Sequence, residues 1–136
     1  MAANEVHVPI KSGNDIVIAR SQGRMLATEL GFSSGDTTLI ATAISELGRN
    51  IVSYARQGEI LITAINGSDR SGILIVASDK GPGISDVQQA LRDGFSTSGG
   101  LGLGLPGVRR LMDEFEVTSM PKRGTTVKVK KWKQRT

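Results

Sequence analysis

The segment ISELGRNIVSYA, residues Ile44–Ala55, carries the pattern that decides how this chain folds. At 100° per residue, its apolar side chains fall on one stripe of a helix, as expected of a helix that packs against a core. Glu46 and Asn50 lie one turn apart and outside that stripe. Such a pair is common on the wet face of an amphipathic helix. A glutamate can also act as a general base, and an asparagine oxygen suits Mg²⁺, so both interpretations stay open at this point.

The segments around this helix predict a single α+β domain over residues 1–136, because hairpin signals follow one another and helices interrupt them without strict alternation. We expect a two-layer α/β sandwich, with a mixed, mostly antiparallel sheet and helices on one face. Asn14 or Asp15 is expected to cap the first helix, and Ser34 the second. Strands are predicted at Glu5–Ile10, Ile60–Ile65, Gly72–Ser78, Glu116–Ser119 and Thr125–Trp132, and helices at about 15–30, 36–56, 85–91 and 106–115.

Length and composition set the broad class. The 136 residues fit one domain, and 38% apolar residues suffice for a core. The absence of cysteine excludes disulfides, zinc fingers and thiol catalysis. No apolar run is long enough for a signal peptide or a membrane span, so a soluble, cytoplasmic protein without a membrane partner is expected.

The net charge of +4 comes from the C-terminal segment. Seven Lys and Arg residues and no acidic residue follow Pro121, whereas the first 120 residues contain 10 basic and 13 acidic residues. Nucleic-acid binding by base stacking uses several aromatic side chains among the basic ones, and here only Trp132 lies among these charges. A solvated strand and tail is therefore favoured, and no nucleic-acid partner is expected.

A second candidate site is the turn Ser78-Asp79-Lys80-Gly81-Pro82-Gly83-Ile84, which follows an aliphatic run typical of a strand. Its two glycines leave room for a ligand to approach the backbone. The carboxylate of Asp79 could accept a hydrogen bond from an exocyclic amine such as adenine N6. An ordinary acidic turn has the same composition, so this motif also has two interpretations.

The third candidate is the glycine-rich stretch SGGLGLGLPG, residues 98–107, which ends at a predicted helix start. Such a loop can direct several backbone N–H groups toward a phosphate, beside the favourable end of a helix dipole. No lysine follows the glycines, which excludes the Gly-Lys-Ser/Thr phosphate loop, and no strand immediately precedes them, which excludes the dinucleotide fingerprint. A flexible linker is the alternative, although leucines that alternate with glycines are unusual in linkers.

In order and spacing, four motifs together resemble the GHKL ATPase superfamily, whose domains share the Bergerat fold. They are Glu46-x-x-x-Asn50, Asp79-x-Gly81-x-Gly83, Gly100-x-Gly102-x-Gly104 and Gly124-Thr125-Thr126. The resemblance spans nearly the whole chain. The segments ISELGRNIVSYA, SDKGPGI and FSTSGGLGLGLPGVRRLMDEF look most like the anti-sigma-factor-type serine kinases, in particular stressosome switch kinases of the RsbT type.

The resemblance implies that ATP and Mg²⁺ are the cofactors. Asn50 would bind Mg²⁺, and Glu46 would act as base or orient the attacking hydroxyl. Arg49 would contact substrate or phosphate, or would be a plain surface charge. Asp79 would hold the adenine amino group, with Thr126 nearby through water. The implied nucleotide-binding residues are Asn50, Asp79, Gly81, Gly83, Ile84, Gly100, Leu101, Gly102, Leu103, Gly104 and Thr126.

The activity implied by the resemblance is phosphoryl transfer to a serine or threonine of another protein. STAS-type antagonist and scaffold proteins would be the substrates, and a PP2C-type phosphatase would be the activated target. Histidine phosphorylation is not expected, because the one histidine, His7, falls in the first predicted strand and no dimerisation domain is recognised. The alternative is a nucleotide-gated binding or anti-sigma-factor module whose main output is partner binding.

Overall fold

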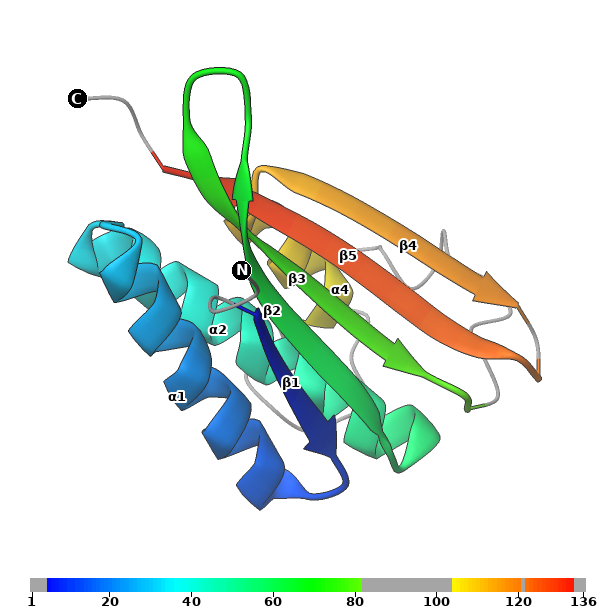
Figure 1. The fold of residues 1–136 in the computed structure, drawn as a ribbon. Coiled ribbons are helices and arrows are strands. Elements are labelled where there is room, and N and C mark those ends of the chain that lie inside the picture. Colours follow the sequence, from blue (N-terminus) through cyan, green and yellow to red (C-terminus); the bar gives the residue numbers. More distant parts are fainter. Residues whose placement is uncertain (1–4, 82–103, 121, 134–136) are drawn as a thin grey trace.

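The computed structural model describes residues 5–81, 104–120 and 122–133 (Figure 1). Its elements combine helices with a single sheet, as the sequence predicts. In chain order they are β1 (Glu5–Ile10), α1 (Gly13–Glu29), α2 (Ser34–Asn50), the π-helical segment η1 (Ile51–Ala55), β2 (Gly58–Asn66), β3 (Ser71–Asp79), α4 (Gly104–Leu111), β4 (Glu114–Met120) and β5 (Gly124–Trp132).

The five described strands form one sheet in the order β1-β2-β3-β5-β4. Every neighbouring pair among them is antiparallel, whereas the sequence predicted a mixed, mostly antiparallel sheet. Helices α1, α2 and α4 lie on the same face of the sheet (Figure 1). The predicted α+β sandwich with helices on one face is therefore confirmed.

The core lies between this sheet face and the helices. Ile60 and Ile62 of β2 and Ile73 and Ile75 of β3 are fully buried, and Ile44 of α2 packs in the same cluster. Because side chains alternate along a strand, the residues between these isoleucines face the other side of the sheet, where they are half-buried. Aliphatic burial of this kind supplies the main stabilising free energy of the fold.

Two glycines allow α1 and α2 to pack closely. A Cβ added to Gly23 would lie 2.1 Å from Cδ1 of Ile44, and one added to Gly48 would lie 2.9 Å from Cγ1 of Ile16. Each glycine therefore accepts an isoleucine side chain from the opposite helix. These two contacts fix the distance and orientation of α1 relative to α2, and so the spacing between the exposed side chains of the two helices.

The helix starts differ slightly from the sequence predictions. The N-cap position of α1 is Ser12 rather than Asn14 or Asp15, and the Asp15 carboxylate instead accepts from the backbone N–H of Lys11 at 2.9 Å. The N-cap of α2 is Ser33, whose hydroxyl accepts from the Asp36 N–H at 3.1 Å, so the prediction of Ser34 was wrong by one residue. The predicted helix at 85–91 lies outside the described residues.

The predicted helix end at residue 115 was also wrong. Helix α4 ends at Leu111, and Phe115 pairs with Val129 across the β4–β5 ladder. The Asp113 N–H donates to the Lys130 carbonyl at 2.9 Å, so sheet hydrogen bonds replace helical ones from this point. An apolar residue such as Phe115 can pack against the core from a helix or from a strand. Apolar spacing alone therefore assigned it to the wrong element.

The basic C-terminal strand finds partners within the fold. Lys131 is 8% exposed, and its ammonium donates to the Leu111 carbonyl at 2.9 Å. Lys130 pairs with Glu114 at 3.7 Å, and the guanidinium of Arg70 lies 4.8 Å from the centre of the Trp132 ring.

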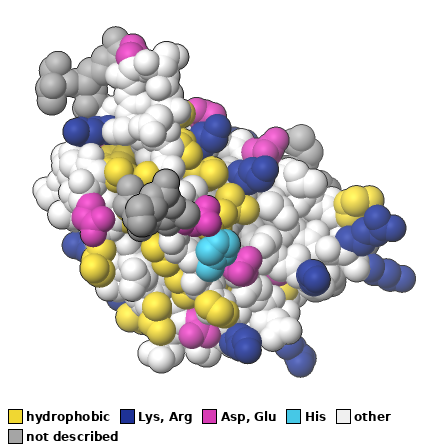
Figure 2. All heavy atoms as spheres, viewed as in Figure 1, with side chains coloured by type: hydrophobic (Ala, Val, Ile, Leu, Met, Phe, Trp, Pro, Cys, Tyr) yellow, Lys and Arg dark blue, Asp and Glu magenta, His cyan; other side chains and the backbone are white. Residues whose placement is uncertain are grey.

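On the molecular surface, acidic and basic side chains surround the apolar area in the middle of the view in Figure 2. Within the described ranges, no helix is long and apolar enough to cross a membrane.

Candidate functional site

The centre of the candidate site is the carboxylate of Glu46, which α2 holds almost completely buried, with 4% of the side chain exposed. Its Oε2 accepts a hydrogen bond from Nη1 of Arg49, one turn further along the helix, at 2.5 Å. Its Oε1 accepts from the backbone N–H of Gly104 at 3.3 Å. A buried carboxylate requires such donors because it has left water, so both oxygens are positioned rather than free.

Gly104 connects this carboxylate to the end of the glycine-rich stretch. It is the first residue of α4 and has a φ of 53°, in the left-handed region that glycine adopts readily. Although 58 residues separate them in sequence, Gly104 and Glu46 meet because α4 packs against α2. The motif order seen in the sequence thus corresponds to a contact in space.

Arg49 is the residue whose role the sequence left open. Its side chain is 39% exposed, and its ion pair with Glu46 directs the guanidinium along the surface of α2. Arg49 is therefore a partner of the buried carboxylate, and it also borders the cavity described below.

Asn50 is the last residue of α2 and is half-buried. The helix continues into the π-helical segment η1, a local change of helical geometry that is frequent at functional sites. Within the part of the chain that the structure describes, no group of three or more His, Cys, Asp or Glu residues could hold a metal. A single amide oxygen still fits Mg²⁺, which usually keeps several waters and takes its other ligands from substrate phosphates.

Asp79 lies at the end of β3, and backbone groups fix its orientation. Its Oδ1 accepts from the N–H of Gly81 at 2.8 Å and from the N–H of Thr125 at 3.3 Å. Both of these hydrogen bonds from described residues go to Oδ1, so Oδ2 is the oxygen that we expect to accept from a ligand amine. Gly124 permits this approach: it has a φ of 98°, and an added Cβ would lie 2.0 Å from the Asp79 carbonyl oxygen.

Gly81 and Thr126 lie close to the same end of the sheet. An added Cβ at Gly81 would lie 2.5 Å from Cβ of Ala55, so the end of η1 packs directly on this glycine. Thr126 is opposite Ser78 in the β3–β5 ladder, one position from the residue that bonds Asp79. The remaining predicted nucleotide-binding residues lie outside the described ranges: Gly83, Ile84, Gly100, Leu101, Gly102 and Leu103.

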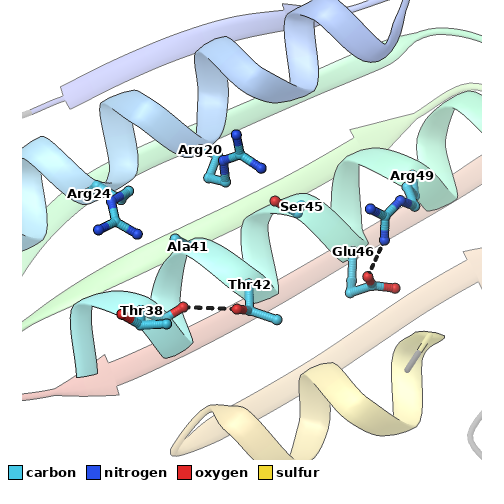
Figure 3. A pocket seen from close by; sticks show the side chains of 8 residues that line it. All are labelled: Arg20, Arg24, Thr38, Ala41, Thr42, Ser45, Glu46 and Arg49. Atoms are coloured by element: carbon cyan, nitrogen blue, oxygen red, sulfur yellow. Dashed lines mark hydrogen bonds and ion pairs between the residues drawn. The ribbon is translucent and has the colours of Figure 1, made fainter. Parts of the chain in front are cut away.

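The sequence did not predict the cavity of about 400 Å³ between α1 and α2 (Figure 3). Arg20 and Arg24 border it from α1, and the residues that border it from α2 are Thr38, Ala41, Thr42, Ser45, Glu46 and Arg49. The available signal was the spacing of Arg20 and Arg24, which places both on one helix face. Nothing in the sequence alone indicated which element that face would meet.

Comparison with known proteins identifies the family of this chain. The sequence model of the family described as "Histidine kinase-, DNA gyrase B-, and HSP90-like ATPase" matches residues 35–135. The chain belongs to this family. The match includes both Glu46 and Asp79, so the family's ATP use applies to the part of the chain that builds the site.

Two groups of relatives narrow the comparison. The chain is 53% identical to "Serine/threonine-protein kinase RsbT" of Bacillus subtilis over 118 residues, which cover 87% of this chain and 89% of the relative. It is 32% identical to "Anti-sigma F factor" of Caldanaerobacter subterraneus over 126 residues, which cover 90% and 87%. These findings bear out the prediction of an ATP-using enzyme related to serine/threonine-protein kinases.

A solved structure supports the fold independently. "Mycobacterial sensor histidine kinase MprB" superposes with a TM-score of 0.57 at 18% identity, covering 96% of this chain and all of that one. At that identity the likeness concerns the fold of the family. The one histidine of the present chain, His7, lies exposed on β1 beside Glu5 and Glu59.

Proposed function

We propose that this protein is a Mg²⁺-dependent kinase that transfers the terminal phosphate of ATP to a serine or threonine of another protein. The observation that carries the proposal is the buried Glu46 carboxylate, which lies between the start of α4 at Gly104 and the guanidinium of Arg49. A carboxylate at the end of a phosphate-binding loop is placed to receive a proton from an attacking hydroxyl. The 53% identity to a serine/threonine-protein kinase supports the same activity.

Each residue would have a limited task, because phosphoryl transfer depends mainly on positioning and on charge neutralisation. Glu46 would orient the acceptor hydroxyl and take its proton, while Arg49 keeps the carboxylate in place. Asn50 would hold Mg²⁺, which neutralises phosphate charge when bound. Asp79 would accept from the adenine amine through Oδ2. Thr126, the neighbouring glycines and the leucines of the glycine-rich stretch would complete the nucleotide site.

We assign STAS-type antagonist and scaffold proteins as the substrates, within a cytoplasmic partner-switching complex that also contains a PP2C-type phosphatase activated by this kinase. The support is the RsbT-type motif set together with the anti-sigma F factor relatives. Residues 1–136 would act as one catalytic domain.

The test is transfer of radiolabelled phosphate from ATP to a STAS-domain protein. Glu46→Gln is expected to reduce transfer by about 10²–10⁴-fold, the usual contribution of a positioned general base, with nucleotide affinity retained. Asn50→Ala is expected to abolish the Mg²⁺ dependence of nucleotide binding. Glu116→Gln is a matched control, because Glu116 is an exposed residue of the edge strand β4 and forms none of the contacts described around Glu46. Full transfer by the Glu46→Gln variant would refute the assigned role.

A second candidate function is a nucleotide-gated binding module. The observation that favours it is the group of relatives named "Anti-sigma F factor", a name that refers to action against a sigma factor and not to a kinase. The same Glu46→Gln variant separates the two functions. If it binds and activates the downstream partner as the wild type does while failing to phosphorylate, then binding is the main output.

A further inference from the structure

The cavity between α1 and α2 carries an excess of positive charge. Glu46 and Arg49 are paired with each other. Arg20 and Arg24 are exposed, and neither forms an ion pair or a hydrogen bond with a residue in the described ranges. Figure 3 shows both arginine side chains on the side of α1 that faces α2. Two adjacent cations without a carboxylate partner favour the binding of an anion.

Ser45 adds an observation of a different kind. Its side-chain oxygen is buried, and it is the one such atom in the described part of the chain without a hydrogen-bond partner. The other hydroxyls of the cavity wall are used within the helix, since Thr38 donates to the Ser34 carbonyl at 3.0 Å and Thr42 donates to the Thr38 carbonyl at 2.9 Å. A buried hydroxyl without a partner is costly, and Ser45 forms part of the cavity wall. A small movement of that wall that lets a ligand accept from the hydroxyl would remove the cost.

From these contacts we infer that the cavity between α1 and α2 binds the dianionic phosphate group of a phosphate monoester. A dianion matches two guanidinium groups, and its three terminal oxygens can accept from Arg20, Arg24 and Ser45 together. A single carboxylate carries half that charge and has fewer acceptor oxygens. The cavity volume of about 400 Å³ also exceeds what one such group requires, which leaves room for the chain that carries it.

The position of the cavity distinguishes it from the nucleotide site. On α2, Ser45 and Asn50 point about 140° apart, with Glu46 between them. Neither Asn50 nor Gly104 borders the cavity. A phosphate there would lie across the Glu46 carboxylate from the proposed nucleotide site, on a face of α2 that a protein acceptor would reach without displacing the nucleotide. The natural source is then the phosphoserine or phosphothreonine of the product protein, and this part of the inference rests on the proposed kinase function. Free phosphate is the other source of the same chemistry.

Binding can be measured without any kinase reaction. The protein is saturated with ADP and magnesium chloride, so that the nucleotide loop is occupied, and then titrated at pH 7.5 while backbone amide NMR signals are recorded. The probes are N-acetyl-O-phosphoserine amide, inorganic phosphate and, as a monoanion control, acetate. We expect both phosphates to shift the amide signals of Ser45 and Thr42, and acetate to bind at least tenfold more weakly.

Three variants test the assigned contacts. Arg20→Gln and Arg24→Gln should each weaken phosphate binding by at least tenfold, and Ser45→Ala by about threefold, with ADP affinity unchanged. Arg109→Gln removes the same charge from an exposed position of α4 outside the cavity wall, and should bind as the wild type does. Thermal melts establish that each variant is folded.

The outcomes separate the two sources and the two proposals. Phosphoserine that binds at least as tightly as inorganic phosphate supports a phosphoprotein ligand, and binding of inorganic phosphate alone supports free phosphate. Acetate that binds as tightly as phosphate, or phosphate binding that is equal in wild type and both arginine variants, overturns the inference. If the wild-type protein binds phosphate in this cavity but transfers no phosphate from ATP to a STAS-domain protein, the result counts against the kinase proposal and not against this site.

Discussion

Replacing Gly124 by alanine should lower the stability of the fold and disturb the proposed nucleotide site. The residue has a φ of 98°, and its added Cβ would lie 2.0 Å from the Asp79 carbonyl oxygen and 2.8 Å from Cα of Lys80. Positive φ costs an L-residue about 1–2 kcal/mol. Because the clashing atoms belong to backbone, the end of β3 must move, at a further cost of about 1–3 kcal/mol. We therefore expect the free energy of unfolding to fall by about 2–5 kcal/mol.

Urea denaturation and thermal melts measure this loss, which corresponds to a decrease in Tm of roughly 10 °C for a chain of this size. Movement of β3 also displaces Asp79, so affinity for a fluorescent ATP analogue should fall by at least tenfold. Gly13→Ala is the matched control, since no atom lies within 4 Å of its added Cβ and its φ is not positive. If Gly124→Ala unfolds at the wild-type urea concentration and binds nucleotide normally, the close approach is not what requires glycine there.

Two further substitutions test the packing. Ile44→Ala removes a fully buried side chain and should lower the free energy of unfolding by about 2–5 kcal/mol, whereas Val17→Ala, at a residue that is 48% exposed, should change it by less than about 0.5 kcal/mol. Lys131→Met leaves the Leu111 carbonyl without its donor and should cost about 1–3 kcal/mol by urea denaturation. The exposed Lys128→Met is its control, and equal losses in the two lysine variants would contradict the role given to Lys131.

The sequence predicted the features that depend on local periodicity. The apolar stripe of α2 placed Ile44 in the core and Glu46 outside the stripe, and turn residues located the β2–β3 hairpin. The sequence-based prediction failed where an apolar residue could belong to either of two elements. Phe115 was assigned to a helix, but it pairs with Val129 of β5 and belongs to strand β4. Hydrophobic spacing contains no information on which ladder a residue will join.

The candidate site shows the same division. Motif order singled out Glu46 and Asp79 as candidates, but the contact of the Thr125 N–H with Asp79 depends on the β3–β5 register, which the sequence does not provide. The cavity beside Arg20 required the packing of α1 on α2 at Gly23, a tertiary contact made by the absence of a side chain. Charged residues on a helix face look alike in sequence whether they meet solvent or a neighbouring helix.

The β2–β3 hairpin offers a practical handle for following this protein in solution. Its ladder starts with Gly58 opposite Asp79 and ends with Asn66 opposite Ser71, so the turn at residues 67–70 lies about 25 Å along the strands from the proposed adenine contact. Figure 1 shows this turn projecting beyond the rest of the sheet. A cysteine introduced at Ser68 would be the sole thiol in the chain. A dye attached there would report tumbling and complex formation by anisotropy without touching the end of the sheet that holds the proposed nucleotide site.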